Sequence, residues 1–480
     1  MNRSPVILSF VFAVLFLLFY PPIYGIRDEA VYMATSYVLR HGTLDALKAA
    51  EPIATMILYH GKYNPFYPLG TGLLLIPFTL LSWRGAFLMG LCCHLLGAWL
   101  FRRICRSQGI THPLVFALYL FFPAFVLFSR TIMSDVPSLL AALLAYDAYF
   151  VKKRKCQAGI FFGLTLFFRS SNAILIFPFL AVEFLKIIQT GEKNDFKALI
   201  TGYLPFVAGN WLYSWYVYGS PFLAGYSYQF TGLKSFSLAN LPAGLLEYFM
   251  MLNIAYPAML FSFFVKKEKR PVEGLLTVFL FLTVFSIYFY FQAFPVPAAK
   301  FVFGNRYLFP ALPFLIMGYG NFIVGCIERF SAKIQKVLSV SMMAGLIFSS
   351  AMIHFEHQKI LNKQKSYKDF IYSISKAGDV LIYDDGSAEL ILKIWGDRVY
   401  IPFHGVKTID ENAGLLKQKP SVFLITRQSS YSEGVMRPSD GFKDASQDLS
   451  GKYQLKPLNA PAGFRVWEIT GIVAGHPGQS

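Results

Sequence analysis

Two adjacent carboxylates, Asp28 and Glu29, lie just beyond the first apolar segment of the chain, 5–20. Acidic side chains close to a membrane span are costly to place and are often functional. A carboxylate at the level of the lipid headgroups can take the proton from an acceptor hydroxyl as that oxygen becomes a nucleophile. Asp28 could also cap the helix that starts at Glu29, by accepting free backbone N–H groups. The two roles are compatible, and we take Asp28 as the candidate catalytic base, with Glu29 beside it.

Two more charged side chains stand in short polar turns between apolar segments. Asp135 belongs to the stretch RTIMSDVP, where it could carry chemistry or cap the next helix, which has Pro137 in its first turn. Arg169 opens the stretch RSSN and needs an anionic or carbonyl partner. That partner could belong to a substrate, or Arg169 could form a structural ion pair or extend to the membrane surface. We keep both as site candidates, with Asp135 as a second acidic site.

A cation suited to phosphate stands late in the apolar part of the chain. Arg306, followed by Tyr307, lies in the stretch GNRYLFPALP. Arginine can hold a phosphate bidentately through charge-assisted hydrogen bonds, although it could instead be an interfacial residue whose head reaches water. Lys62 lies in YHGKYNPFYPLGTGLL, which could also be only a loop that enters the membrane. A donor-phosphate site would draw on Arg306, Tyr307, Lys62 and Arg169.

The sequence does not define a metal or cofactor site. Asp28, Glu29 and Asp135 could together ligate a divalent metal, but no cofactor is certain. His354 and His357 have metal-compatible spacing, yet without a second cluster we expect solvated residues at a helix exit. The sequence also lacks a phosphate-binding loop, a Ser-His-Asp signature and a dinucleotide fingerprint.

The composition predicts a mainly α-helical, polytopic membrane protein. The 480 residues are 55% hydrophobic and only 15% charged, whereas soluble domains carry roughly a quarter charged residues. The formal net charge of +17 could suggest nucleic acid. We exclude that partner because Lys and Arg fall mostly in short loops between apolar segments, as the positive-inside rule describes. None of the five cysteines lies in a segment placed outside, so no external disulfide is expected.

The alternation of apolar segments and basic loops predicts a multi-pass protein of the plasma (inner) membrane with a cytoplasmic N-terminus. Segment 69–83 is short for a span, which takes ~20 residues, and is predicted to be an interfacial or re-entrant helix. About eleven transmembrane helices are expected, at 5–20, 85–101, 113–128, 136–151, 158–168, 171–188, 199–218, 245–265, 275–294, 307–327 and 337–353.

Two polar regions complete the predicted organisation. The first outer loop, 24–68, is unusually long and is expected to contain helices at 29–41 and 44–59. We predict a transmembrane catalytic module at 1–353 and a small extracytoplasmic α/β domain at 354–480. The expected elements of that domain are strands at 379–384, 398–402 and 421–426, a helix at 388–395 and an edge strand at 464–469.

Six stretches, in this order, resemble motifs of the GT-C glycosyltransferases. They are DEAVY, HGKYNPFYPLGTGLLLIPF, RTIMSDVP, FFRSSNAILIFP, YVYGSPF and NRYLFPALPFL, and together they extend over most of 1–353. The resemblance is to the family-39-like branch, which includes protein O-mannosyltransferases and lipid A aminoarabinose transferases. It implies an inverting transfer of a sugar from a polyprenyl-phosphate carrier to an acceptor on the extracytoplasmic side.

The resemblance also implies roles for single residues. Asp28 matches the aspartate that activates the acceptor, Asp135 matches a second acidic position, and Arg306 matches the arginine that contacts the donor phosphate. Lys62 is a looser match, because the aminoarabinose-transferase branch has Lys-Pro-Pro where this chain has Lys-Tyr-Asn-Pro. That difference weakens the parallel with lipid A transfer.

We therefore predict a membrane glycosyltransferase, of hexosyl or pentosyl type, that uses a polyprenyl-phosphate sugar in the lipid bilayer. The acceptor could be a protein, lipid A or a polysaccharide. The alternative function is a multi-spanning transporter or flippase of lipid-linked saccharides. That class predicts internal repeats and charges at mid-span, whereas the ionisable residues here cluster at span ends.

Overall fold

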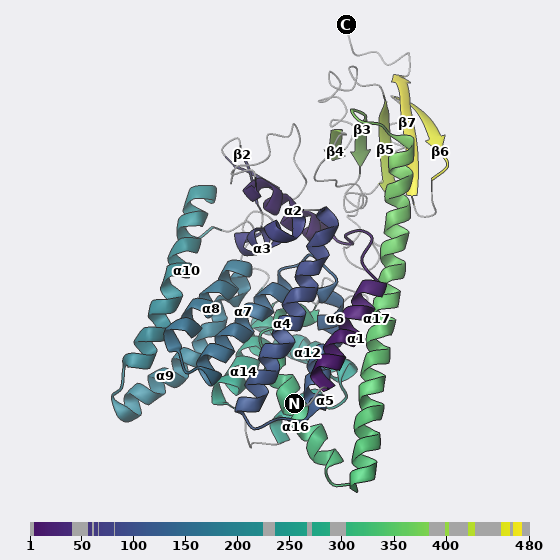
Figure 1. Ribbon diagram of the computed structural model, residues 1–480. Coiled ribbons are helices and arrows are strands. Elements are labelled where there is room, and N and C mark those ends of the chain that lie inside the picture. Colours follow the sequence, from purple (N-terminus) through teal and green to yellow (C-terminus); the bar gives the residue numbers. More distant parts are fainter. Residues whose placement is uncertain are drawn as a thin grey trace.

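The computed structural model describes residues 4–40, 56–59, 62–65, 67–80, 82–223, 236–265, 271–288, 304–383, 399–402, 421–427, 453–460 and 464–472. Most of these residues form a block of helices, and a small sheet stands at one end of it (Figure 1). The mainly helical architecture agrees with the prediction from the sequence.

The longest described helix, α17 (Ala332–Ile374), runs along one side of the block (Figure 1). It starts at the end of the block where the N-terminus lies and reaches the sheet at the other end. Helix α1 (Ser4–Leu18) packs beside it, with the Phe12 ring centroid 5.8 Å from that of His354. The proposed domain boundary at 353/354 therefore falls within one continuous helix.

The rest of the block consists of helices that are buried largely through apolar side chains. Their bounds are α4 (Ala86–Ser107), α5 (Pro113–Leu120), α6 (Pro123–Ser129), α7 (Asp135–Tyr146), α8 (Lys155–Phe168), α9 (Phe177–Thr190), α10 (Asn194–Tyr218), α12 (Leu241–Ala255), α13 (Met259–Val265), α14 (Val272–Ser286) and α16 (Leu312–Ile327). Short turns extend several of them: η1 (Trp83–Gly85), η2 (Asp147–Val151), η3 (Ser170–Ile176), η5 (Leu238–Asn240) and η7 (Asn305–Leu308).

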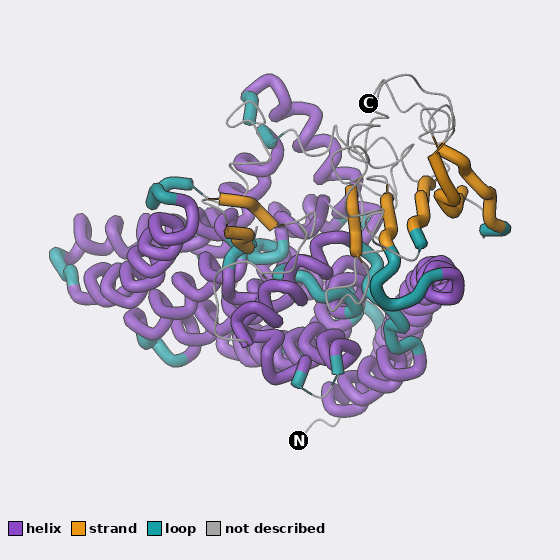
Figure 2. Tube along the Cα trace, turned by 90° about the horizontal axis from the view of Figure 1, so that it is seen from above, coloured by secondary structure: helices purple, strands orange, loops and turns teal. Residues whose placement is uncertain are grey.

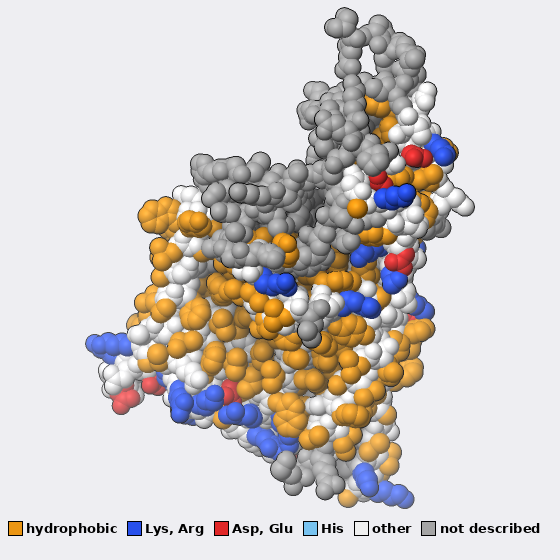
Figure 3. Space-filling model, turned by 45° about the horizontal axis from the view of Figure 1, so that its top comes forward, with side chains coloured by type: hydrophobic (Ala, Val, Ile, Leu, Met, Phe, Trp, Pro, Cys, Tyr) orange, Lys and Arg blue, Asp and Glu red, His pale blue; other side chains and the backbone are white. Residues whose placement is uncertain are grey.

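Four helical segments of the described chain are long and apolar enough to cross a membrane, and five shorter helices are also apolar. The four are Trp83–Ser107, Ser170–Thr190, Leu238–Ala255 and Ala332–Ile374. Figure 3 shows a broad band of hydrophobic side chains over the helical block, with Lys and Arg gathered along its lower edge. This pattern is typical of a polytopic membrane protein.

Two of the predicted continuous spans are broken within their length, and proline explains both breaks. A third, 307–327, becomes an α-helix only at Leu312, after η7 and a turn. Segment 113–128 divides into α5 and α6, because Phe122 is extended before Pro123 and that proline starts a new helix. Segment 245–265 divides into α12 and α13 at Tyr256, which precedes a proline and is also extended. Ala258 follows with a φ of 63°, outside helical geometry.

The C-terminal strands form one five-stranded sheet, in the order β4-β3-β5-β7-β6. Strands β3 (Val380–Tyr383), β4 (Val399–Pro402) and β5 (Val422–Arg427) are parallel, as expected for an α/β unit. The prediction of an edge strand at 464–469 is wrong, because β7 (Phe464–Ile472) lies between β5 and β6 (Tyr453–Leu458). The helix expected at 388–395 lies outside the described residues.

The sheet packs on the end of α17. Tyr367 and Ile371 of that helix share a separate buried cluster with Leu381, Phe423 and Ile425 of the strands. Seen from above, the sheet lies over one margin of the helical block, beside the end of α17 (Figure 2). One helix thus connects the apolar block to the sheet.

The first polar region contains α2 (Arg27–Arg40), a short hairpin and α3 (Leu69–Thr79). The hairpin pairs β1 (Met56–Tyr59) with β2 (Lys62–Pro65). Helix α2 confirms the helix predicted at 29–41, whereas the helix predicted at 44–59 is wrong at its end, where β1 lies. Helix α3 has 11 residues and confirms that this segment is too short for a span.

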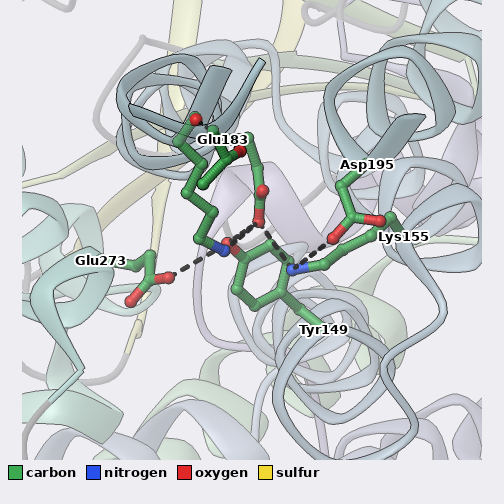
Figure 4. A network of polar contacts seen from close by, with 7 residues as sticks. Tyr149, Lys155, Glu183, Asp195 and Glu273 are labelled. Atoms are coloured by element: carbon green, nitrogen blue, oxygen red, sulfur yellow. Dashed lines mark hydrogen bonds and ion pairs between the residues drawn. The ribbon is translucent and has the colours of Figure 1, made fainter. Parts of the chain in front are cut away.

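A buried polar cluster ties several helices together (Figure 4). It lies where α8 begins, at the end of the block away from α2. The Tyr149 hydroxyl contacts Glu183 and lies 3.0 Å from Glu273 Oε1. The Lys155 ammonium lies 2.7 Å from Glu183 Oε1 and 3.3 Å from the centre of the Tyr149 ring. Buried charges persist in proteins when they are paired in this way. We interpret the cluster as a structural connection between α8, α9 and α14.

Candidate active site

Asp28 and Arg306 meet at the end of the helical block where α2 lies. Asp28 is in the first turn of α2, and Arg306 belongs to η7. The Asp28 Oδ2 and Arg306 Nη1 atoms are 3.8 Å apart, with 30% and 13% of the side chains exposed. The structure thus brings together the candidate base and the candidate phosphate ligand, which come from opposite ends of the helical part of the sequence.

Glu29 is buried, with 1% of its surface exposed, and its oxygens accept three backbone hydrogen bonds. Oε2 accepts from the N–H groups of Gly25 and Ile26, at 2.6 and 3.0 Å. Oε1 accepts from the N–H of Ile132 at 2.8 Å. Burial raises the pKa of this carboxyl to about 7, although the three N–H donors act in the opposite direction. Glu29 therefore joins the start of α2 to the turn between α6 and α7.

A second ion pair, between Asp135 and Arg169, lies close to the first. Asp135 is fully buried in the first turn of α7, and Arg169 precedes η3 with 12% of its side chain exposed. The guanidinium carbon of Arg169 is 5.2 Å from the centre of the Tyr307 ring, and that of Arg306 is 5.3 Å from it. Cations at this range are attracted to the ring face. Tyr307 thus links the two arginines, and Phe285 stacks on it at 5.0 Å between ring centres.

Tyr32 fixes α2 against the same α6–α7 turn. Its hydroxyl donates to the Ser134 hydroxyl at 2.9 Å, and burial raises the pKa of the phenol, so the proton stays on this oxygen. Its ring stacks on Tyr67 with 4.8 Å between ring centres. Tyr32 and Glu29 lie on successive turns of α2, so the helix is attached at two points. Asp28 is thereby held in a defined position.

Two glycines let α3 approach α2 and α8 closely. A Cβ at Gly72 would lie 2.6 Å from Thr35 Cγ2 on α2, and one at Gly70 would lie 2.6 Å from the Phe167 carbonyl oxygen on α8. Real Cβ atoms do not come this close, so these positions of the GTG stretch require glycine. Helix α3, predicted to be interfacial or re-entrant, packs against the helix that carries Asp28.

Helix α17 also holds the acidic stretch. The Gln364 amide donates to the Gly25 carbonyl at 3.1 Å. Arg130, which has no exposed surface, donates from Nε to His357 Nδ1 at 3.1 Å and from Nη2 to Gln358 Oε1 at 2.9 Å. The expectation of solvated histidines is wrong for His354, which is fully buried. These contacts join α17 to the two segments that Glu29 also binds, namely the residues before α2 and the turn between α6 and α7.

The described residues contain no group of three or more His, Cys, Asp and Glu side chains that could hold a metal ion. Asp28, Glu29 and Asp135 have separate partners, namely Arg306, backbone N–H groups and Arg169. Lys62 lies in β2, whose hairpin packs near α2. The arrangement therefore offers a partly exposed carboxylate and guanidinium for acid–base and anion-binding chemistry, rather than a set of convergent metal ligands.

Several residues of the site escaped the sequence analysis. Gln364 and Arg130 became relevant only through contacts across more than two hundred residues of sequence. Phe285 stands in an apolar run where nothing distinguishes it from a lipid-facing side chain. Tyr32 was within the DEAVY motif, and its position one turn beyond Asp28 is the single signal that could have identified it.

No protein family model matches this chain, and no curated protein sequence matches it. Solved structures do. The crystal structure of ArnT from Cupriavidus metallidurans bound to undecaprenyl phosphate aligns with a TM-score of 0.58 at 10% identity, over 98% of each chain. The apo structure of the same protein gives a TM-score of 0.60 at 10% identity, over 96% of this chain and 97% of that one.

The likeness extends over nearly the whole chain, and at this identity it shows the fold. The protein is thus a polytopic membrane protein with the fold of ArnT.

Proposed function

We propose that this protein is a membrane glycosyltransferase that moves a sugar from a polyprenyl-phosphate donor to a hydroxyl acceptor. The observation that carries the proposal is the meeting of Asp28 and Arg306, within an ArnT-like fold, at one end of the apolar helical block. A base and an anion-binding cation side by side at headgroup level are what such a transfer requires.

In the proposed reaction, the acceptor oxygen forms a bond to the anomeric carbon of the sugar. The bond from that carbon to the phosphate oxygen breaks, and its electron pair remains on the phosphate. Asp28 takes the acceptor proton, and the Arg306 guanidinium stabilises the charge that develops on the phosphate. Attack opposite to the leaving phosphate inverts the configuration at the anomeric carbon.

The geometry of the ion pair supports this division of roles. Charge-assisted N–H···O bonds are typically about 2.7–2.9 Å long, whereas Asp28 and Arg306 are 3.8 Å apart. Both side chains are also partly exposed. A donor phosphate can therefore replace Asp28 as the partner of Arg306, which leaves the carboxylate available to the acceptor. The Asp135–Arg169 pair would position Tyr307 beside the same phosphate.

Donor and orientation follow from separate observations. ArnT in the aligned structure is bound to undecaprenyl phosphate, and we propose a donor on a polyprenyl phosphate for this chain. The basic loops would face the cytoplasm, which places α2, η7 and the sheet on the extracytoplasmic face of the plasma membrane. The transferred group is a hexose or a pentose, and the acceptor is a protein, lipid or polysaccharide hydroxyl.

Transfer in detergent solution tests the proposal against the transporter alternative. The purified protein is incubated with a radiolabelled polyprenyl-phosphate sugar and an extract of cell-envelope acceptors, and label in non-donor products is counted. Transport requires two compartments, so it cannot produce labelled product in detergent. We expect product formation that grows with time. Label that stays on the donor, with donor movement across proteoliposomes, would favour the transporter instead.

A further inference from the structure

A small pocket lies at the end of the helical block opposite α2, where the last turns of α4 meet the start of α5. Apolar walls include Phe101 and Phe116, and Arg102, Arg106 and His112 also line it. None of the described residues that line the pocket is acidic.

The two arginines of this pocket are like charges on one face of α4. Arg102 and Arg106 are four residues apart, a spacing that places side chains next to each other and makes like charges repel. The adjacent Arg103 differs, because its Nη2 lies 3.2 Å from the buried Asp147 carboxylate. Within the described part of the chain, neither Arg102 nor Arg106 forms an ion pair. An anion bound between them would replace repulsion by attraction.

His112 supplies a neutral donor. Its Nδ1 accepts a hydrogen bond from the Leu114 N–H at 3.2 Å, so the ring proton of the neutral form is on Nε2. Glu328 is close enough to interact with the charge of His112, but it does not line the pocket. The pocket therefore presents two guanidinium groups and one imidazole N–H without a competing carboxylate on its walls.

The position of the pocket at the end of a long apolar helix selects the source of the anion. It lies beside the last two turns of Trp83–Ser107, a segment long and apolar enough to span a membrane. The Arg102 guanidinium lies over the Trp99 ring, 5.1 Å from its centre, and tryptophan is enriched where membrane meets water. A group that is anionic and continues into apolar chains suits cations beside phenylalanine walls.

We propose that this pocket binds the phosphate of an anionic phospholipid, on the membrane face opposite the Asp28–Arg306 site. The two arginines hold the phosphate oxygens by charge-assisted hydrogen bonds. This lipid site is separate from the proposed donor site and does not depend on the transfer reaction.

Native mass spectrometry of the full-length protein in a mild detergent tests the proposal. The probes are phosphatidylglycerol, phosphatidylcholine and inorganic phosphate. We expect phosphatidylglycerol to remain bound to the wild-type protein in preference to phosphatidylcholine. R102Q/R106Q should weaken that binding roughly tenfold or more, because it removes two charge-assisted contacts. K333A/K336A removes the same charge at the start of α17, on the same end of the block, and should bind as the wild type does.

Three results would overturn the lipid assignment: equal binding of both lipids, unchanged phosphatidylglycerol binding in R102Q/R106Q, or competition by inorganic phosphate at equal concentration. If R102Q/R106Q fails to fold, the single variant R106Q replaces it, because Arg106 is exposed and its removal leaves the packing of α4 intact. A charge-preserving R102K/R106K protein should keep most of the binding.

Discussion

The carboxylate of Asp28 and the guanidinium of Arg306 are 3.8 Å apart, so the structure gives each of them an opposite charge nearby. In the free protein the two neutralise each other. With a donor bound, the phosphate would replace Asp28 as the partner of Arg306 and leave the carboxylate free to accept the proton of the acceptor. The pair therefore connects donor binding to activation of the acceptor.

Arg306→Ala should raise the donor concentration needed for half-maximal transfer and lower kcat/KM for the donor. Hydrogen bonds to charged groups contribute about 1.5–3 kcal/mol, which corresponds to roughly a ten- to hundredfold loss. Arg306→Lys should recover part of the lost kcat/KM, because the positive charge remains while the bidentate contact to the phosphate is lost. Steady-state kinetics at varied donor concentration measure both constants. Arg329→Ala, at the other end of the block, is the control. An unchanged donor dependence would rule out the phosphate role.

Glu29 should make stability fall as the pH rises. Its pKa is raised by burial from 4.5 to about 7 in the folded protein, so between these values the folded state binds a proton that the unfolded state does not. The slope of the unfolding free energy against pH is then negative in this window. The total loss is on the order of 3 kcal/mol from pH 4.5 to 7.

Thermal unfolding in detergent, followed from pH 4.5 to 8, measures this effect. Glu29→Gln cannot ionise, so subtraction of its profile isolates the contribution of Glu29. The wild type should lose stability relative to Glu29→Gln as the pH rises, and the difference should level off above pH 7. Parallel profiles would show that Glu29 does not titrate in this range.

Sequence alone singled out several residues of the candidate site but not their partners. Asp28, Asp135 and Arg306 stood out as charges at the ends of apolar segments, and the structure places all three in one region. That Asp135 pairs with Arg169, and that Glu29 accepts three backbone N–H groups, could not be predicted. Such contacts depend on how α2 packs against the α6–α7 turn, and no local pattern encodes that packing.

At the scale of elements, α17 carries the sheet and contacts the acidic stretch. Gln364 holds the Gly25 carbonyl, and the Gly25 N–H in turn bonds to Glu29. Arg130 donates a hydrogen bond to His357 of α17. Two residues further along the chain, the N–H of Ile132 donates to Glu29. Through these contacts, a shift of α17 would displace the first turn of α2.

Gln364→Ala should reduce kcat for transfer about two- to tenfold, because one hydrogen bond worth about 0.5–1.5 kcal/mol no longer fixes this turn. The donor KM should change little, since Gln364 does not contact Arg306 in the described structure. Lys363→Ala alters an exposed neighbour on the same helix and should leave both constants unchanged. Equal rates for the two variants would mean that α17 does not position the site.

Apolar runs and prolines explain which elements could be predicted from the sequence. Long apolar runs gave the helices, and buried runs such as VLIY and VFLITR gave the central strands. Strand β6 was missed because its sequence, YQLKPL, has few apolar residues and contains proline. The breaks at Pro123 and Pro257 could have been predicted from the prolines themselves. The β1–β2 hairpin could not, since each of its strands has only four residues and no local pattern encodes the pairing between them.

At the scale of the whole molecule, the proposed orientation places the two ends of α17 on opposite sides of the membrane. Lys333 and Lys363 are separated by about 45 Å of helix, more than the hydrocarbon core is thick. In intact cells, Lys363→Cys should react with a membrane-impermeant maleimide above the wild-type background, and Lys333→Cys should react only after permeabilisation. The reverse pattern would place the Asp28–Arg306 site in the cytoplasm.

The most direct measurement of the central claim is transfer by Asp28→Asn, with donor binding recorded on the same preparation. Asparagine keeps the size of the side chain but cannot accept the acceptor proton. We expect the rate of label transfer to fall by roughly a hundredfold or more, the scale of general-base catalysis. Binding of the polyprenyl-phosphate sugar should persist, because Arg306 remains. Full transfer activity in Asp28→Asn would contradict the assignment of Asp28 as the catalytic base.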